Sequence, residues 1–164
     1  TAFIIIDVQN ILVETGFETQ KLLEKISYLQ DQARKQQIEI IYIQHIETEE
    51  ALTSEDWKLS PLLKRQSDEK VFQKRYNSMF KETGLKEYLD QQGIEKLVLC
   101  GMQTEYCVDT SVKVAFEHGY KLVVPEGTVT TFDGDDIPAE TINDFYENIW
   151  DERFADVLDY KTIF

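Results

Sequence analysis

The sequence has few cysteines and no apolar stretch long enough to cross a membrane. Its two cysteines, Cys100 and Cys107, have a spacing that fits neither a zinc site nor a CxxC redox motif. Two cysteines also do not make the disulfide framework of a small secreted domain. No signal-peptide pattern follows Thr1. Together these absences predict a protein of the reducing cytoplasm.

Basic residues are also scarce. The chain has 17 lysines and arginines against 31 aspartates and glutamates, a formal net charge of −14. This charge argues against nucleic acid or an anionic membrane surface as the main partner, because both repel an acidic protein. A local basic pocket can still exist on such a protein, so a small-molecule substrate remains the expected partner.

What is present indicates one globular domain. A chain of 164 residues can bury a substantial core, and its 42% hydrophobic and 12% aromatic content is ordinary for such a domain. We find no internal repeat, no low-complexity tract and no composition shift. We therefore expect a single domain over residues 1–164.

The distribution of apolar residues predicts strands alternating with helices. Residues 2–6 form a continuous apolar run that ends at Asp7, which is typical of a strand covered on both faces. Further strands are expected at residues 38–43, 70–76, 96–100, 121–124 and, as an edge strand, 154–157. Helices are expected at residues 22–33, 84–92, 104–117 and 139–149.

Two segments do not fit this alternation. Residues 46–70 are expected to form an irregular connection with a short helix, and residues 128–136 a polar loop. The order of the other elements predicts an α/β protein, with three α/β/α layers and a Rossmann-like, mostly parallel sheet covered by helices on both faces. In such sheets, ligands bind at the carboxyl ends of the strands.

Residues 97–110 contain the strongest candidate for chemistry. They predict a buried strand, a glycine-bearing turn at Gly101 and the start of a helix that carries Cys107 in its first turn. Helix N-terminal amides favour a thiolate and can stabilise an oxyanion. Cys107 therefore fits either a nucleophile or a small buried side chain, whereas Cys100 fits only the core of the strand.

Three more polar residues are expected at the same edge of the sheet. Asp7 ends the first strand, where it could act in catalysis or bond the following turn. His45 ends the second strand and could be the base of a Cys-His pair or an ordinary hydrogen-bonded histidine. Lys74 lies in a charged stretch, and its surroundings alone suggest a solvated surface lysine.

With these residues in place, the chain resembles the isochorismatase-like cysteine hydrolase superfamily over nearly its whole length. The resemblance rests on motifs that occur in the same order in the superfamily. These are the strand and aspartate of residues 4–10, the lysine segment of residues 71–80, the turn and cysteine of residues 97–110, and residues 119–120 with the strand after them.

The resemblance implies an Asp-Lys-Cys catalytic triad at Asp7, Lys74 and Cys107. It gives Lys74 a catalytic role and makes Asp7 rather than His45 the base. It also implies a cis peptide bond before Gln103 and an oxyanion hole formed by the backbone amides of Gln103 and Cys107. In this scheme Lys74 and the helix N-terminus lower the pKa of the Cys107 thiol.

Two departures from the superfamily concern ligands. Its nicotinamidases hold a metal through an aspartate and histidines after the second strand, where this chain has His45 and no second histidine, so we expect no metal and no cofactor. An aromatic residue often follows the opening motif, where this chain has Ile11 and Leu12. The expected substrate-binding residues are Gln9, Leu12, Trp57, Tyr76 and Tyr106.

The sequence thus predicts a cysteine hydrolase of a small amide or related C–N substrate, acting through a thioester. One alternative is isochorismatase-type hydrolysis of a vinyl ether, which needs an acid more than a nucleophile. The other is a non-catalytic binding protein. The resemblance further implies a homodimer or larger homo-oligomer.

Overall fold

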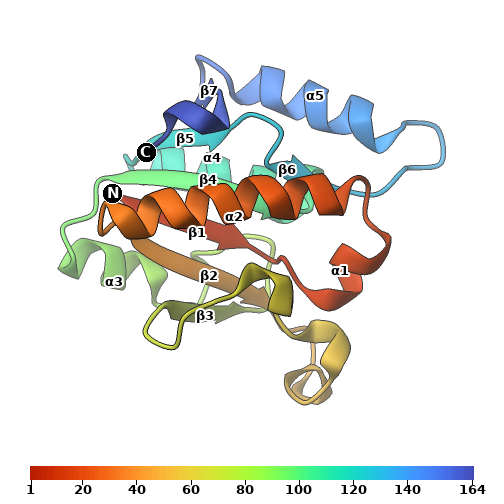
Figure 1. Ribbon diagram of the computed structural model, residues 1–164, viewed down its shortest axis with the longest axis horizontal. Helices are drawn as coiled ribbons and strands as arrows, with labels where there is room; N and C mark the ends of the chain where they lie inside the picture. Colours follow the sequence, from red (N-terminus) through yellow and green to blue (C-terminus); the bar gives the residue numbers. More distant parts are fainter.

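The computed structural model describes residues 1–164 and is built around one seven-stranded sheet. The strands run in the order β3-β2-β1-β4-β5-β7, and β6 pairs with the end of β4 beyond β5 (Figure 1). Every pair is parallel. The strands are β1 (Ala2–Ile6), β2 (Glu39–His45), β3 (Lys70–Lys74), β4 (Lys96–Met102), β5 (Lys121–Pro125), β6 (Val129–Thr130) and β7 (Asp156–Leu158).

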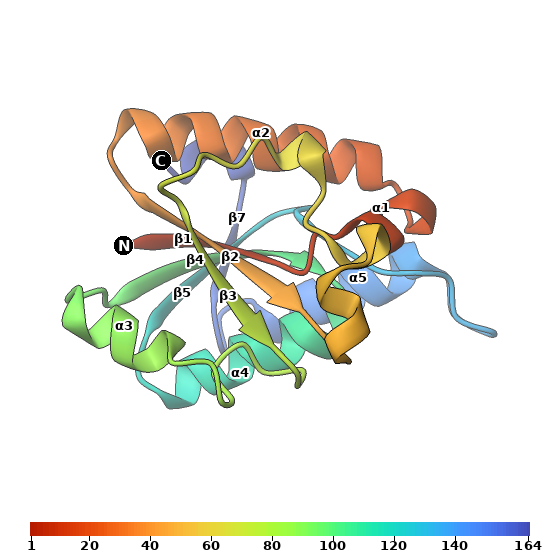
Figure 2. The same cartoon turned by 90° about the horizontal axis from the view of Figure 1, so that it is seen from below.

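Helices cover both faces of this sheet. Helix α2 lies on one face, and α3 and α4 lie on the other (Figure 2). The α-helices are α1 (Asn10–Thr15), α2 (Thr19–Lys35), α3 (Leu85–Gln91), α4 (Asp109–Glu117) and α5 (Ala139–Trp150). The three-layer α/β/α prediction is confirmed. No helix has the length and apolar character needed to span a membrane.

The side chains of β1 pack into two separate hydrophobic clusters, one on each face of the sheet. All five residues of β1 are fully buried. Ile4 and Ile6 pack in the cluster shared with α4, whereas Phe3 and Ile5 pack in the cluster shared with α2. Each such side chain contributes about 1.5–3 kcal/mol on burial. The continuous apolar pattern, rather than an alternating one, therefore follows from helices on both sides.

Three segments differ from the sequence-based expectation. The expected polar loop at residues 128–136 contains β6, which forms because Gly101 and Met102 extend past the end of β5 and accept a new neighbour. The helix expected at residues 104–117 starts as a π-helical turn, Thr104–Val108, before α4. The connection at residues 46–70 holds three short 3₁₀ turns: Glu49–Leu52, Glu55–Trp57 and Pro61–Leu63.

The register of the sheet brings the ends of four strands together. His45 is the direct neighbour of Lys74, and Ile6 is the direct neighbour of both Ile43 and Gly101. Asp7 therefore leaves the sheet beside the turn that carries Cys107. Helix α1 and the segment after β2 lie at this same end (Figure 1).

The close approach of β1 and β4 at this end of the sheet depends on Gly101, and replacement of Gly101 by alanine tests this. Its φ is +126°, and an added Cβ would lie 2.0 Å from the backbone oxygen of Ile6. We expect Gly101→Ala to lower the free energy of unfolding by about 3 kcal/mol or more, because both backbones must shift. Urea titration measures the loss.

Gly93→Ala is the matched control. Gly93 also has a positive φ of +62°, but an added Cβ there meets nothing within 4 Å. Gly93→Ala should lower the free energy of unfolding by only about 1 kcal/mol, which is the cost of placing alanine in a left-handed backbone conformation. Equal losses for the two variants would show that close approach to Ile6 is unimportant.

Candidate active site

Lys74 is the centre of the polar cluster at the ends of the strands. Its side chain is fully buried, and Nζ lies 2.8 Å from Asp7 Oδ2, 2.9 Å from His45 Nδ1 and 3.1 Å from Cys107 Sγ. Nζ also donates to the backbone oxygen of Tyr76 at 3.0 Å. The three residues of the expected triad are thus brought together, and Lys74 is not the surface lysine that its neighbours in the sequence suggest.

Asp7 is buried directly beneath this lysine. Its backbone adopts a left-handed conformation with φ 50°, which turns the chain out of β1. One carboxylate oxygen pairs with Lys74, while the other, Oδ1, is buried without a hydrogen-bond partner. Burial raises the pKa of Asp7, and the Lys74 ammonium opposes that rise. The free oxygen is available to accept a proton.

Cys107 faces this pair from the π-helical turn. Burial raises the pKa of its thiol to about 12, the Asp7 carboxylate adds to the rise, and Lys74 only partly offsets it. The expectation of a lowered thiol pKa is therefore wrong: the loss of hydration and a nearby negative charge outweigh the lysine. The resting site holds a neutral thiol beside a charged pair.

His45 belongs to the cluster as a partner of Lys74 rather than of Cys107. Burial lowers the pKa of His45, and the positive charge of Lys74 lowers it further. Since its Nδ1 accepts from the Lys74 ammonium, the neutral ring carries its proton on Nε2, which lies 3.7 Å from Glu47. His45 is thus not placed as the base for the thiol.

The backbone of Gln103 lies at the turn before Cys107. The Met102–Gln103 peptide bond is cis. The Gln103 N–H donates to no backbone carbonyl, whereas Tyr106 N and Val108 N both donate to the carbonyl of Gln103. Thr131 fixes the turn from the outside, donating through Oγ1 to Glu105 Oε1 at 2.7 Å. Sequence reasoning missed Thr131 and Glu105, since neither ends a predicted element.

Gln9 and Trp57 lie beside the triad, but Gln9 supports the site rather than facing it. Gln9 is fully buried, and its amide donates to the backbone oxygens of His45 (3.0 Å) and Trp57 (2.6 Å). Its oxygen accepts from His45 N at 2.8 Å. Gln9 thus has no free group for a substrate, which differs from its expected role. The Trp57 ring lies 6.0 Å from the imidazole of His45.

The other expected substrate-binding residues lie at different depths. Tyr76 and Tyr106 are 40% and 54% exposed. Leu12, in α1, packs against the core cluster shared with α2. Asn77, which the sequence analysis did not single out, has its Oδ1 at 3.9 Å from Cys107 Sγ. Asn77 therefore lies next to the sulfur, and the two tyrosines are accessible to solvent.

The donor atoms of Asp7, His45 and Cys107 all lie within 4.8 Å of one another, a spacing that a metal ion could use. The Lys74 ammonium contacts all three donors at 3.1 Å or less and supplies the positive charge itself. A metal would have to displace this fully buried lysine. The donor set therefore fits proton transfer better than metal binding.

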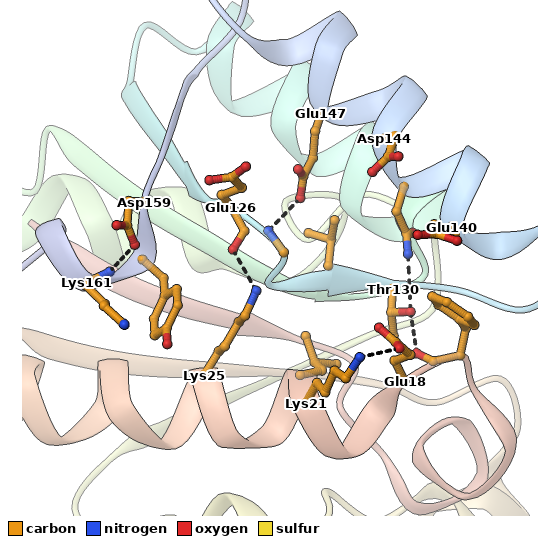
Figure 3. A pocket seen from close by; sticks show the side chains of 16 residues that line it. Glu18, Lys21, Lys25, Glu126, Thr130, Glu140, Asp144, Glu147, Asp159 and Lys161 are labelled. Carbon is orange, nitrogen blue, oxygen red and sulfur yellow. Dashed lines mark hydrogen bonds and ion pairs between the residues drawn. The ribbon is translucent and has the colours of Figure 1, made fainter.

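A cavity of about 460 Å³ lies away from the triad, between α2, β6, α5 and the C-terminal turn (Figure 3). Its lining is largely charged, including Lys21, Lys25 and Glu147, and burial raises the pKa of Glu147. Asn143 connects this cavity to the π-helical turn that carries Cys107, since Thr104 Oγ1 donates to Asn143 Oδ1 at 2.6 Å. No cysteine or serine lines this cavity, so the Cys107 cluster is the candidate active site.

The structure thus combines a parallel α/β sheet with a cysteine held beside a buried Asp-Lys pair. The isochorismatase domain family model matches residues 1–161. The chain therefore belongs to the isochorismatase family, as its resemblance predicts.

Known relatives agree with this assignment. A streptothricin hydrolase of Streptomyces noursei is 28% identical over 84% of this chain, which spans about half (51%) of that protein. The maleamate amidohydrolase of Pseudomonas putida is 37% identical over a shorter segment, 36% of this chain and 28% of that protein. A crystal structure of an isochorismatase family protein superposes with a TM-score of 0.92, at 30% identity, covering 96% of this chain and 97% of the other.

The charge arrangement predicts how Cys107 responds to loss of Asp7. Because the Asp7 carboxylate disfavours a thiolate nearby, Asp7→Asn should lower the pKa of the Cys107 thiol. The variant should therefore react with iodoacetamide faster than the wild type near pH 8. The pH dependence of the alkylation rate, followed by mass spectrometry, measures the shift.

Lys74→Met is the opposite control, since removal of the ammonium should raise the thiol pKa further and slow alkylation. Cys100 is fully buried and should remain unlabelled in all three proteins. An unchanged or slower rate in Asp7→Asn would contradict the assigned charge arrangement.

Proposed function

We propose that this protein is a cysteine hydrolase that cleaves a small amide or a related C–N bond through a thioester on Cys107. The observation that carries the proposal is the buried Lys74 ammonium, which contacts both Asp7 Oδ2 and Cys107 Sγ. This contact lets a proton move from sulfur to carboxylate while the positive charge stays between them. A nucleophile, its base and a shared counter-ion are the parts that covalent catalysis requires.

The chemistry would proceed in two halves. Asp7 accepts the thiol proton as Cys107 Sγ attacks the substrate carbonyl carbon. Collapse of the tetrahedral intermediate breaks the C–N bond, and the protonated Asp7 gives its proton to the leaving nitrogen. A water molecule, deprotonated by Asp7, then attacks the thioester, releases the carboxylic acid and restores the thiol.

The oxyanion would be held by backbone amides. The Gln103 N–H, which donates to no backbone carbonyl, supports its expected role together with the amide of Cys107. Two such donors oppose the charge that develops on the carbonyl oxygen. This hydrolysis requires no cofactor beyond the groups present.

The rim of the site supports a small substrate. Tyr76 and Tyr106 are exposed aromatic residues, although Lys81 Nζ lies 3.8 Å from the centre of the Tyr76 ring. Asn77 offers an amide near the sulfur, and the Trp57 ring lies 6.0 Å from that of His45. We therefore keep Trp57, Tyr76 and Tyr106 as proposed substrate contacts, with Leu12 behind them. The cytoplasmic location and the homo-oligomer remain predictions.

One observation favours a second candidate reaction, the hydrolysis of a vinyl ether. Burial raises the pKa of Asp7, which suits a carboxyl group that donates a proton to a carbon. That reaction needs Asp7 and Lys74, and water adds to the oxocarbenium ion formed by protonation, so no protein nucleophile is required. The presence of Cys107 beside Lys74 favours the amide reaction as the main activity.

Cysteine and aspartate variants separate the two reactions. With an amide substrate found by screening, Cys107→Ala should lower kcat/KM by about 10³-fold or more, because no other group can form the thioester. Asp7→Asn should lower it by a similar factor. Rapid quenching followed by mass spectrometry should detect an acyl adduct on the peptide that contains Cys107.

Cys100→Ala is the matched control, since it removes the other thiol without touching the site, and it should retain activity. A Cys107→Ala protein with full activity on the amide substrate would rule out covalent catalysis. If a vinyl ether substrate is cleaved equally well by this variant but not by Asp7→Asn, the second candidate is correct.

A further inference from the structure

The Lys74 ammonium has more acceptors than hydrogens. Four atoms lie within 3.1 Å of Nζ: Asp7 Oδ2, His45 Nδ1, Tyr76 O and Cys107 Sγ. An ammonium has only three N–H bonds to donate. Two of the acceptors, His45 Nδ1 and Tyr76 O, take no part in the proton transfer proposed above. The other two exchange the proton, so the negative charge moves between them.

His45 is held in place more firmly than a histidine at a strand end requires. It is the register neighbour of Lys74, so the two side chains extend from adjacent strands at the same level of the sheet. Gln9 binds both its backbone N–H and its carbonyl, and the Trp57 ring lies 6.0 Å from the imidazole. This support holds the backbone of His45 beside Lys74, and its Nδ1 lies 2.9 Å from Nζ.

We propose that His45 is a positioning residue, which in its neutral Nε2–H form anchors the Lys74 ammonium and on protonation releases it. The inference rests on the proposed cysteine hydrolase function and assigns a role to a residue that is neither nucleophile nor base. His45 Nδ1 and Tyr76 O occupy two N–H bonds of Lys74. The third N–H then points to Asp7 Oδ2 when the thiol is neutral and to Cys107 Sγ when the thiolate forms.

Protonation of His45 breaks this arrangement in two ways. Nδ1 gains a hydrogen and ceases to be an acceptor, and two positive charges then lie 2.9 Å apart. The Lys74 ammonium must turn away or lose its bond to Asp7. Activity should therefore be present where His45 is neutral and fall as the pH decreases.

The charged groups around His45 come from each neighbouring element. Lys74 on β3 opposes protonation, whereas Asp7 after β1 and Glu47 after β2 favour it; Cys107 in the π-helical turn is a neutral thiol. Burial of the ring and Lys74 prevail, so the pKa of His45 lies below its ordinary value. The contribution of His45 to the acid limb of the pH profile therefore lies below the ordinary pKa of a histidine.

The tautomer is the first measurement, and it does not depend on turnover. The chain has only two histidines, so ¹⁵N spectra of the wild type and of His118→Gln identify the His45 ring nitrogens directly. We expect a protonated Nε2, an unprotonated Nδ1 and a signal from Nδ1 that changes in Lys74→Met. A protonated Nδ1 at neutral pH would overturn the proposal.

Kinetics of two His45 variants form the second measurement. His45→Leu removes the acceptor and should lower kcat about 10- to 100-fold with little change in KM, since Lys74 is misplaced but the rim is intact. In His45→Asn the amide oxygen takes the place of Nδ1 and cannot titrate. This variant should recover most of the activity, and its acid limb should move to lower pH.

His118→Gln is the matched control, because His118 ends α4, packs edge-on against Phe80 and lies outside the site. It should leave kcat and the pH profile unchanged. Thermal unfolding of each variant distinguishes loss of Lys74 anchoring from loss of the fold. The proposal requires His45→Asn to fold, to keep most of the wild-type kcat and to have an acid limb at lower pH.

Three kinetic outcomes would overturn the role of His45. The first is an unchanged kcat in His45→Leu, and the second is a higher KM in that variant with no change in kcat. The third is an acid limb of His45→Asn that is identical to that of the wild type. Failure of the cysteine hydrolase itself gives a different result: Cys107→Ala retains activity while the ¹⁵N spectra still show His45 bonded to Lys74.

Discussion

The buried ammonium of Lys74 is the interaction on which the site depends. A charged group removed from water loses several kcal/mol of hydration, which only close and well-oriented partners offset. Asp7 supplies the opposite charge at 2.8 Å, and His45 and the Tyr76 carbonyl supply neutral acceptors. Each partner comes from a different segment. The ends of β1, β2 and β3 must therefore keep their register, and any slip would leave a buried charge unpaired.

The same interaction explains why the cysteine remains a thiol. A thiolate beside the Asp7 carboxylate would place two negative charges around one ammonium in a site with little water, and burial raises the thiol pKa to about 12. In the proposed mechanism, the nucleophilic thiolate therefore forms only when Asp7 takes the proton. Reactivity toward oxidants and stray electrophiles is held down by this coupling, because both follow the thiolate rather than the thiol.

The sequence predicts the layers, the strands and the edge of the sheet that carries the site, because these follow from apolar periodicity and parallel topology. It predicts Lys74 only through resemblance: Lys70 and Arg75 nearby are exposed, and nothing local marks Lys74 as buried. The thiol pKa is predicted with the wrong sign, since helix position is visible in the sequence and desolvation is not. Strand β6 is missed because a two-residue strand depends on the space left beside β4.

Conservation of charge links these observations. The resting site contains one positive and one negative group, and the proposed transfer of the proton from Cys107 to Asp7 would leave that balance unchanged. The environment around Lys74 therefore need not reorganise during attack, which is the advantage of a preorganised polar site. Protonation of His45, by contrast, adds a positive charge 2.9 Å from the Lys74 ammonium, and the exposed Glu47, 3.7 Å from Nε2, offsets it less than burial and Lys74 oppose it. A site that tolerates movement of charge but not gain of charge requires a neutral histidine at this position, and burial of the ring maintains it.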